Sequence, residues 1–312
     1  MKTEQNMFSV TCEKSMTTVS SSSTSLQHCC GVTVSGPGRI SSRGDGTVAW
    51  TSGAFITVQE RPDFGHLTQF QTKRVVCCLA VSPGGKLIAS GEAGKDPCVR
   101  VYNREQEKYT SKLKGHSFEI VCVEWHQNGR LLVSCGNVHD RQIIIWDTKK
   151  NVQVAYSRLN MEPKAMGFYH KSLITLGKGH IRYWTVPETS TSNMTKALIG
   201  RNVALKNRRN AAFNDMTTTV SALFIVSPDG IGKLTTTRTL QSWCDIPGTN
   251  CITSLQDLLL VGVKDEDDAR VLIMTQNFEQ LKCFQPEQNV PPTPVACQPF
   301  DQSHIVIVYE DR

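Results

Sequence analysis

Two small groups of residues in this sequence carry side chains that could perform chemistry. His116 and the pair His139-Asp140 offer imidazole and carboxylate groups that could bind a metal ion or act as an acid–base pair. The adjacent thiols of Cys77 and Cys78 could supply a nucleophile if one of them ionised near neutral pH. Both cysteines lie inside an apolar run, however, where free cysteine behaves as a small hydrophobic side chain. We therefore expect the two thiols to pack in a core.

Trp146 explains the histidine and the aspartate without catalysis or a metal. It ends the apolar stretch IIIWD at residues 143–147, which reads as a strand covered on both faces. An indole N–H only donates, so a buried Trp146 needs an acceptor. Ser134 can accept this bond and pair with His116, whose second ring nitrogen can pair with Asp140. Each bond contributes on the order of 1 kcal/mol net, while a buried group without a partner costs about 1–3 kcal/mol. We predict that these four residues form a structural tetrad.

The remaining patterns do not indicate an enzyme. The glycine- and lysine-containing stretches at 82–86 and 230–233 have the wrong spacing for a phosphate-binding loop, and each lies between strands rather than before a helix. The Cys-x-x-Cys spacing of zinc ribbons is absent from the sequence. We therefore predict no catalytic residue, no metal site and no cofactor.

The elements that position the tetrad come from an internal repeat. A shift of 44 residues lays 75–103 over 119–147. Among the pairs of residues that then coincide are Ser90 with Ser134, Asp96 with Asp140, and Tyr102 with Trp146. The first copy thus predicts a partial tetrad, in which Thr72 stands where the second copy has His116. A period of about 44 residues is typical of four-stranded propeller blades.

The second copy contains four short β-strand patterns joined by turns, at 119–126, 131–136, 143–148 and 152–157. Weaker copies flank these two, and one of them ends at Trp184, which we expect to be the corresponding blade aromatic. The chain is therefore predicted to be all-β, a β-propeller of about six complete four-stranded blades and an incomplete seventh. The propeller is expected to span 30–312 with a loop insertion at about 187–212, after a disordered Ser/Thr-rich N-terminus at 1–29.

The end of the chain leaves the seventh blade short of strands. The dipeptide Asp311-Arg312 repeats the Asp140-Arg141 that precedes the IIIWD strand, so an apolar third strand would be expected to follow it. Residues 30–34 could supply the outermost strand, but one inner strand would still be missing, with unpaired edges. We therefore expect a fragment or a truncated product.

Composition is that of a soluble globular protein, with 39% apolar and 20% charged residues. The net charge of +6 comes from scattered basic residues, so we predict no nucleic-acid partner. The 12 cysteines lie mostly in apolar runs, and the N-terminus lacks the apolar core of a signal peptide. No apolar run is long enough to span a bilayer. These features predict a reduced, cytoplasmic chain without a membrane partner.

Several motifs resemble known families. Gly115-His116, Asp140 and Trp146-Asp147 resemble the WD-repeat signature, in which such a tetrad is found. Four longer stretches resemble, in kind and order, the first propeller of the family of mitogen-activated protein kinase-binding protein 1 and its spindle-pole, microcephaly-linked paralogue. They are GVTVSGPGRISSRGDGTVAWTSGAFITVQ, LAVSPGGKLIASGEAGKDPCVRVYN, KGHIRYW and LIGRNVALKNRRNAAFNDM. The resemblance runs from about residue 31 to 312. WCDI at 243–246 and the missing blade histidines depart from it.

This resemblance implies a non-catalytic scaffold whose propeller binds other proteins through its top face and rim. Centrosomal and stress-kinase pathway proteins are the implied partners, and the centrosome or spindle pole is the implied location. The kinase-docking region of that family follows its propellers and is not assigned to any residue here. An axonemal WD-repeat protein of cilia and a ubiquitin-ligase substrate receptor remain as alternatives.

Overall fold

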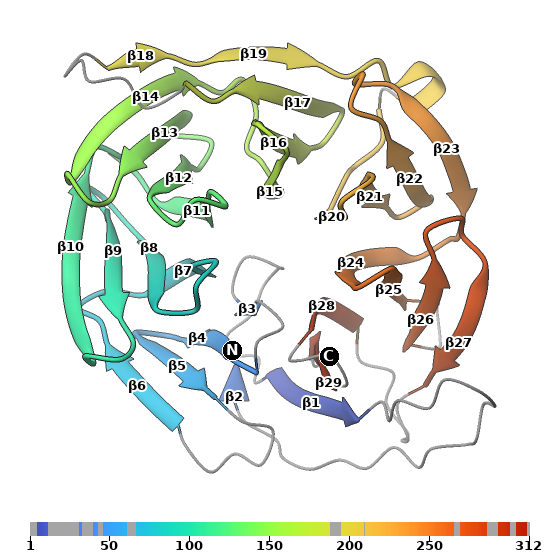
Figure 1. Ribbon diagram of the computed structural model, residues 1–312, viewed down its shortest axis with the longest axis horizontal. Helices are drawn as coiled ribbons and strands as arrows, with labels where there is room; N and C mark the ends of the chain where they lie inside the picture. The colour runs from blue at the N-terminus through green and yellow to red at the C-terminus, as the bar shows by residue number, and fades with distance from the viewer. Residues whose placement is uncertain are drawn as a thin grey trace.

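The strands of the chain form seven sheets arranged in a ring (Figure 1). The computed structural model describes residues 5–11, 31–32, 40–42, 46–60, 67–187, 195–208, 210–264, 269–285, 293–299 and 304–310. Within these residues the chain is almost entirely β, and the prediction of a β-propeller is confirmed.

Six blades are built from strands that follow one another in the sequence. Blades 1 to 3 consist of β3 (Ile40–Ser42), β4 (Val48–Ser52), β5 (Phe55–Gln59) and β6 (Leu67–Gln71); β7 (Val76–Val81), β8 (Leu87–Glu92), β9 (Cys98–Asn103) and β10 (Lys108–Lys114); and β11 (Ile120–Trp125), β12 (Leu131–Gly136), β13 (Gln142–Asp147) and β14 (Val152–Arg158). Blades 4 to 6 consist of β15 (Ala165–Tyr169), β16 (Ser172–Gly177), β17 (His180–Thr185) and β19 (Ile199–Asn202); β20 (Asp215–Thr218), β21 (Leu223–Ser227), β22 (Gly230–Leu234) and β23 (Leu240–Asp245); and β24 (Thr249–Leu255), β25 (Leu258–Lys264), β26 (Ala269–Thr275) and β27 (Gln280–Phe284).

Blade 7 combines strands from both ends of the sequence. Its sheet runs in the order β28 (Thr293–Pro299), β29 (His304–Glu310), β1 (Gln5–Thr11) and β2 (Gly31–Val32), so β1 is the third strand that sequence reasoning found missing. It pairs antiparallel with β29, from Met7↔Val308 to Thr11↔His304. The expectation of disorder over 1–29 therefore does not hold for Gln5–Thr11, and residues 12–29 lie outside the described residues. The physical reason is that β29 would otherwise leave a row of backbone N–H and C=O groups unpaired.

Each blade begins with its innermost strand, and these seven strands surround the centre of the ring (Figure 1). Neighbouring innermost strands contact one another all the way round, including β28 against β3. The side chains of β7 and β12 are buried along their whole length, because adjacent blades cover both faces of each inner sheet. The outer strand β10 instead alternates buried and exposed residues at its end, as expected for a strand with one face in water.

Contacts between blades involve the cysteines that the sequence placed in a core. Cys78 donates its S–H to the carbonyl oxygen of Ile120 in the next blade at 3.3 Å. In the same way Cys251 of blade 6 lies 3.7 Å from the carbonyl oxygen of Pro294 in blade 7. Among the described cysteines none forms a disulfide. These thiols therefore act as small core side chains that also satisfy backbone carbonyls of the neighbouring blade.

The segment expected to be a loop insertion at 187–212 contains regular structure. β18 (Lys196–Ala197) runs parallel to β14 and extends blade 3 to five strands, and β19 then supplies the outermost strand of blade 4. A single 3-10 turn, η2 (Lys206–Arg208), follows. Figure 1 shows β18 and β19 running along the outer edge from blade 3 to blade 4. Residues 188–194 lie outside the described residues. Within the described part of the chain, no helix is long and apolar enough to cross a membrane.

Candidate functional site

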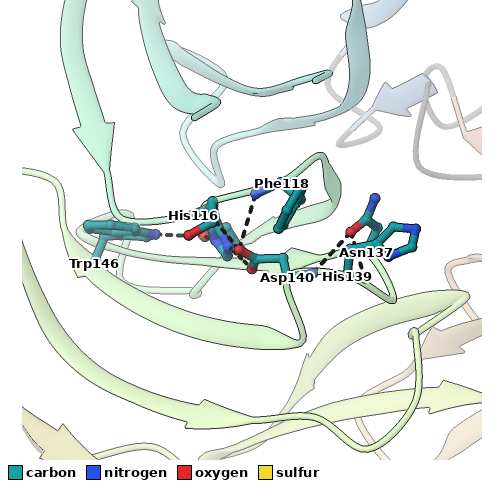
Figure 2. Close-up of polar contacts among 8 residues, drawn as sticks. His116, Phe118, Asn137, His139, Asp140 and Trp146 are labelled. Atoms are coloured by element: carbon teal, nitrogen blue, oxygen red, sulfur yellow. Dashed lines mark hydrogen bonds and ion pairs between the residues drawn. The ribbon is translucent and has the colours of Figure 1, made fainter. Parts of the chain in front are cut away.

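The structure brings His116, Ser134, Asp140 and Trp146 into one chain of contacts in blade 3 (Figure 2). Trp146 Nε1 donates to Ser134 Oγ at 2.7 Å, and this hydroxyl lies 2.7 Å from His116 Nε2. His116 Nδ1 lies 2.6 Å from Asp140 Oδ2. The order of contacts is the one derived from the donors and acceptors of the four side chains.

One arrangement of protons gives every group in this chain a partner. Trp146 donates to the Ser134 oxygen, the Ser134 hydroxyl donates to His116 Nε2, and His116 Nδ1–H donates to the Asp140 carboxylate. Burial alone would raise the pKa of Asp140. The hydrogen bond from His116, together with those from two backbone N–H groups, outweighs burial and holds this pKa below its ordinary value. The carboxylate is thus ionised at neutral pH and fixes the donor role of Nδ1.

Two glycines make room for the tetrad. A Cβ on Gly136 would overlap with Asp140 Oδ2, and a Cβ on Gly115 would lie 2.8 Å from the edge of the Trp146 ring. Any larger residue at either position would displace a tetrad member. Gly115 belongs to the Gly-His pair noted in the sequence, whereas Gly136 was not singled out there. A signal was present, because the strands LLVSCG and SLITLG both end in glycine.

The tetrad also holds the loops that surround it. Asp140 Oδ1 accepts the backbone N–H of Ser117 at 2.6 Å and that of Phe118 at 3.3 Å. Asn137 Oδ1 accepts the N–H groups of His139 and Asp140, at 3.0 and 3.2 Å. Figure 2 shows the carboxylate of Asp140 between His116 on one side and the backbone of Phe118 on the other. The 115–119 and 137–141 loops are therefore fixed against each other.

These loops lie on one face of the ring, which we name the tetrad face. β11 and β12 are antiparallel, and Ile120 at the start of one pairs with Gly136 at the end of the other. The loop that enters each blade and the loop between its second and third strands therefore share this face. The turns between first and second strands lie on the opposite face, because antiparallel strands reverse direction at each turn.

Asp147, the second residue of the Trp-Asp pair, has a separate role. Its Oδ2 accepts from Arg130 Nε and Nη2 at 2.9 and 2.5 Å, and its Oδ1 accepts the backbone N–H groups of Lys149 and Lys150. Burial would raise the pKa of Asp147, but the hydrogen bonds from Arg130 and the backbone hold it below the ordinary value. Asp147 thus stabilises the turn into β14.

Blade 2 brings together only two members of the predicted partial tetrad, Ser90 and Tyr102. Ser90 and Tyr102 are buried on adjacent strands, and burial raises the pKa of Tyr102 to about 12. Asp96 is exposed instead of facing them, and it takes a left-handed backbone conformation with φ of 49°. In blade 3 the left-handed residue is Arg141, whose counterpart in blade 2 is Pro97, and proline cannot adopt a positive φ. The two turns have equal length but different shape, and this difference turns Asp96 outward.

Trp184 in blade 4 has a partner that the sequence analysis missed. Its Nε1 donates to Thr175 Oγ1 at 2.9 Å, and both residues are buried. The register repeats that of the tetrad, since Leu173 pairs with Trp184 as Leu132 pairs with Trp146. Aligning SLITLG with LLVSCG places Thr175 on Ser134, so the signal was available in the repeat.

The residues considered for thiol or metal chemistry have other surroundings. Cys77 donates to Glu119 Oε1 at 2.8 Å, between blades 2 and 3. His139 is exposed and its ring lies 5.9 Å from that of Phe118, while His116 is buried in the tetrad. In the described ranges, no group of three or more His, Cys, Asp or Glu side chains is placed to hold a metal ion.

Comparison with known proteins agrees with this geometry. The family model described as WD domain, G-beta repeat matches residues 63–103 and 107–147, which run from β6 to β13 and include all four tetrad residues. These two segments are therefore WD40 repeats, and the chain as a whole folds into a β-propeller. A crystal structure of RRP9 WD40 repeats superposes with a TM-score of 0.67, covering 88% of this chain and 94% of that chain at 13% identity, which shows the shared fold.

The propeller is homologous to two larger proteins. It is 29% identical to mitogen-activated protein kinase-binding protein 1 of Mus musculus over 258 residues, and 27% identical to WD repeat-containing protein 62 of Mus musculus over 234 residues. The matches cover 78% and 71% of this chain but only 17% and 15% of those proteins. Centriole proteome protein 16 of Chlamydomonas reinhardtii is 24% identical over 203 residues, covering 50% of this chain and 10% of that protein.

The repeat family gives a general expectation for such a domain. WD40 propellers are typically non-catalytic and generally mediate protein–protein interactions. The order of motifs noted in the sequence, which resembles the first propeller of the family of mitogen-activated protein kinase-binding protein 1, agrees with the homology.

Proposed function

We propose that this propeller is a non-catalytic protein-binding module of a scaffold like mitogen-activated protein kinase-binding protein 1, and that it acts at the centrosome or spindle pole. The observation that carries the proposal is homology to that protein over 78% of the chain, which includes the blade with the tetrad. Similarity to a centriole proteome protein supports the proposed location at the centrosome.

The tetrad face supports the binding role. Asp140 fixes the two loops of blade 3 through His116 and through backbone N–H groups, so the surface that a partner would meet is held in one conformation before binding. A rigid surface loses less conformational entropy on association than a mobile one. Loops on a rigid scaffold are a common location for recognition residues.

Proximity labelling in cells tests the proposal. The chain fused to a biotin ligase is expected to label centrosomal proteins or proteins of mitogen-activated protein kinase pathways. His116→Ala releases Asp140 and the loops of blade 3 and is expected to reduce this labelling at equal protein abundance. Thr175→Val removes the corresponding bond in blade 4 and is expected to leave labelling unchanged. Labelling that recovers neither group of proteins would refute the proposed role, and exclusive labelling of ciliary axonemes would assign the chain to an axonemal assembly.

A further inference from the structure

Four large apolar side chains are exposed on consecutive loops of the tetrad face. They are Val75, Phe118, Val138 and Met161, with 48%, 41%, 46% and 40% of their surfaces accessible. Single exposed apolar residues are normal on soluble proteins, whereas a contiguous group of them marks a surface that binds something. Val75 enters blade 2, Phe118 and Val138 lie in the two loops of blade 3, and Met161 precedes blade 4.

Contacts between the loops show that these residues share one surface. The Phe118 ring lies 5.9 Å from the ring of His139, the neighbour of Val138. The backbone N–H of Val138 donates to Glu162 Oε2 at 3.2 Å, which brings this loop next to Met161.

The same connections continue toward blade 2. The backbone N–H of Asp96 donates to the carbonyl of Ser117 at 3.0 Å, and Arg74 Nη1 donates to the carbonyl of Lys95 at 2.6 Å. The residues next to Val75 and Phe118 are thus linked through the loop of blade 2. The apolar side chains therefore belong to one surface across three blades.

The exposed charges around these side chains are mostly positive. Five exposed basic residues lie on the same loops or, for Lys95, on the 93–97 loop that links them: Lys73, Arg74, Lys95, Arg141 and Lys164. Asp96 is the one exposed acidic residue on the described loops 72–75, 93–97, 115–119, 137–141 and 159–164, since Asp140 is buried against His116. Glu119 and Glu162 are half-buried, and each already accepts a hydrogen bond, from Cys77 and from Val138. Taken together, we name the four apolar and five basic residues the apolar–basic patch.

We propose that the apolar–basic patch binds an acidic protein segment whose own apolar side chains pack on Phe118 and Val138. The inference rests on the proposed function as a protein-binding module and names the chemistry of its partner. Positive charge around an apolar centre matches a segment of alternating acidic and apolar residues, because opposite charges speed association and the apolar contacts provide affinity. A single-stranded nucleic acid fits less well, since its bases stack on aromatic platforms and three of the four apolar side chains here are aliphatic.

Selection from a phage-displayed library of random 16-residue peptides tests this proposal on the whole chain. Enriched peptides are expected to have net negative charge and at least two large apolar residues. Phe118→Ser combined with Val138→Ser should weaken their binding at least about tenfold, measured by fluorescence anisotropy. Lys95→Glu combined with Lys164→Glu should weaken it by a similar factor, and raising NaCl from about 0.05 to about 0.5 M should weaken binding to the wild type.

Val220→Ser is the matched control, because Val220 is 93% exposed in the turn between β20 and β21 on the opposite face. It is expected to leave peptide binding unchanged. We expect the serine variants to keep their fold, because Phe118 and Val138 bond to the surrounding loops through their backbone N–H groups and not through their side chains. Circular dichroism melts check this for each variant.

Three results would overturn the inference. Enrichment of neutral or basic peptides would show that the module binds proteins by other chemistry, and peptide binding that the patch variants leave unchanged would show that it binds them elsewhere. The proposed function would stand in both cases. Tighter binding to a labelled oligothymidine or to phosphatidylserine vesicles than to the enriched peptides would assign the basic residues to another class of partner. Failure to enrich any peptide would overturn the inference, whereas the proposed function is tested separately by labelling in cells.

Discussion

Replacing Ser134 with alanine removes the centre of the tetrad. Its hydroxyl oxygen accepts from Trp146 Nε1 at 2.7 Å and lies 2.7 Å from His116 Nε2, and its accessible surface is 0%. The change therefore leaves two buried groups without partners. Each such group costs about 1–3 kcal/mol, so we expect Ser134→Ala to lower the free energy of unfolding by about 4 kcal/mol.

Blade 4 supplies a control in which the buried hydroxyl bonds to an indole but not to an imidazole. Thr175 is also fully buried and accepts from Trp184 Nε1 at 2.9 Å, and no imidazole contact of its hydroxyl is seen within the described residues. Thr175→Val keeps the shape of the side chain and leaves one buried donor alone, at a cost of about 2 kcal/mol. The expected difference between the two variants is thus about 2 kcal/mol.

Urea unfolding followed by far-ultraviolet circular dichroism measures both costs, with equal m-values as the check that the unfolded states are comparable. A double-mutant cycle with Trp146→Phe isolates the Trp–Ser bond, for which we expect a coupling energy of about 1–2 kcal/mol. Equal costs for Ser134→Ala and Thr175→Val, within about 0.5 kcal/mol, would refute the claim that the tetrad acts as a connected chain. A coupling energy near zero would show that the hydrogen bond between Trp146 and Ser134 does not contribute to stability.

Three further changes test other parts of the structure. Gly136→Ala pushes its Cβ into Asp140, so we expect the free energy of unfolding in urea to fall by about 2–4 kcal/mol. Amide hydrogen exchange in the 115–119 loop should also become faster, and an unchanged exchange rate there would contradict the packing argument. Burial raises the pKa of Asp215 to about 7, well above the value near 4 of an unfolded carboxyl, so stability should fall by about 1.4 kcal/mol per pH unit as the pH rises between these values. Asp215→Asn should lack this slope, and an identical pH profile for the two proteins would argue against a buried neutral acid. Arg208 stacks over the Trp243 ring at 3.8 Å, so Arg208→Lys should cost about 0.5–1 kcal/mol in the same unfolding assay although it keeps the charge; no loss would show that the stacking contributes nothing.

Features that depend on local pattern were predictable from the sequence. A strand buried on both faces needs an unbroken apolar run, and the IIIWD stretch shows this in three adjacent residues whose accessible surfaces are all 0%. The tetrad follows from the hydrogen-bonding inventory of four side chains at fixed spacing within one blade. Strand period and donor–acceptor matching are properties of the residues themselves, so no knowledge of distant contacts was needed.

Features that depend on which neighbour a segment meets were not predictable in this way. Nothing in the local pattern of Gln5–Thr11 shows that it pairs with β29, roughly 300 residues away in sequence. The outer strand β19 was read as loop because a longer stretch of chain separates it from its partner β17 than separates the last two strands of the neighbouring blades. Asp96 occupies the aligned position of Asp140, yet one proline changes the turn and turns its side chain to solvent.

The sequence by itself therefore determined the class of the fold, the repeat unit and the four side chains of the tetrad. The tertiary structure alone decided how the ring closes, which blades contain a connected chain of polar groups, and which apolar side chains share a surface. The physical reason is that strand formation and donor–acceptor matching act within one blade. Ring closure and surface contiguity depend instead on backbone pairing and packing between residues far apart in the chain, and these interactions are satisfied only when all the blades are assembled.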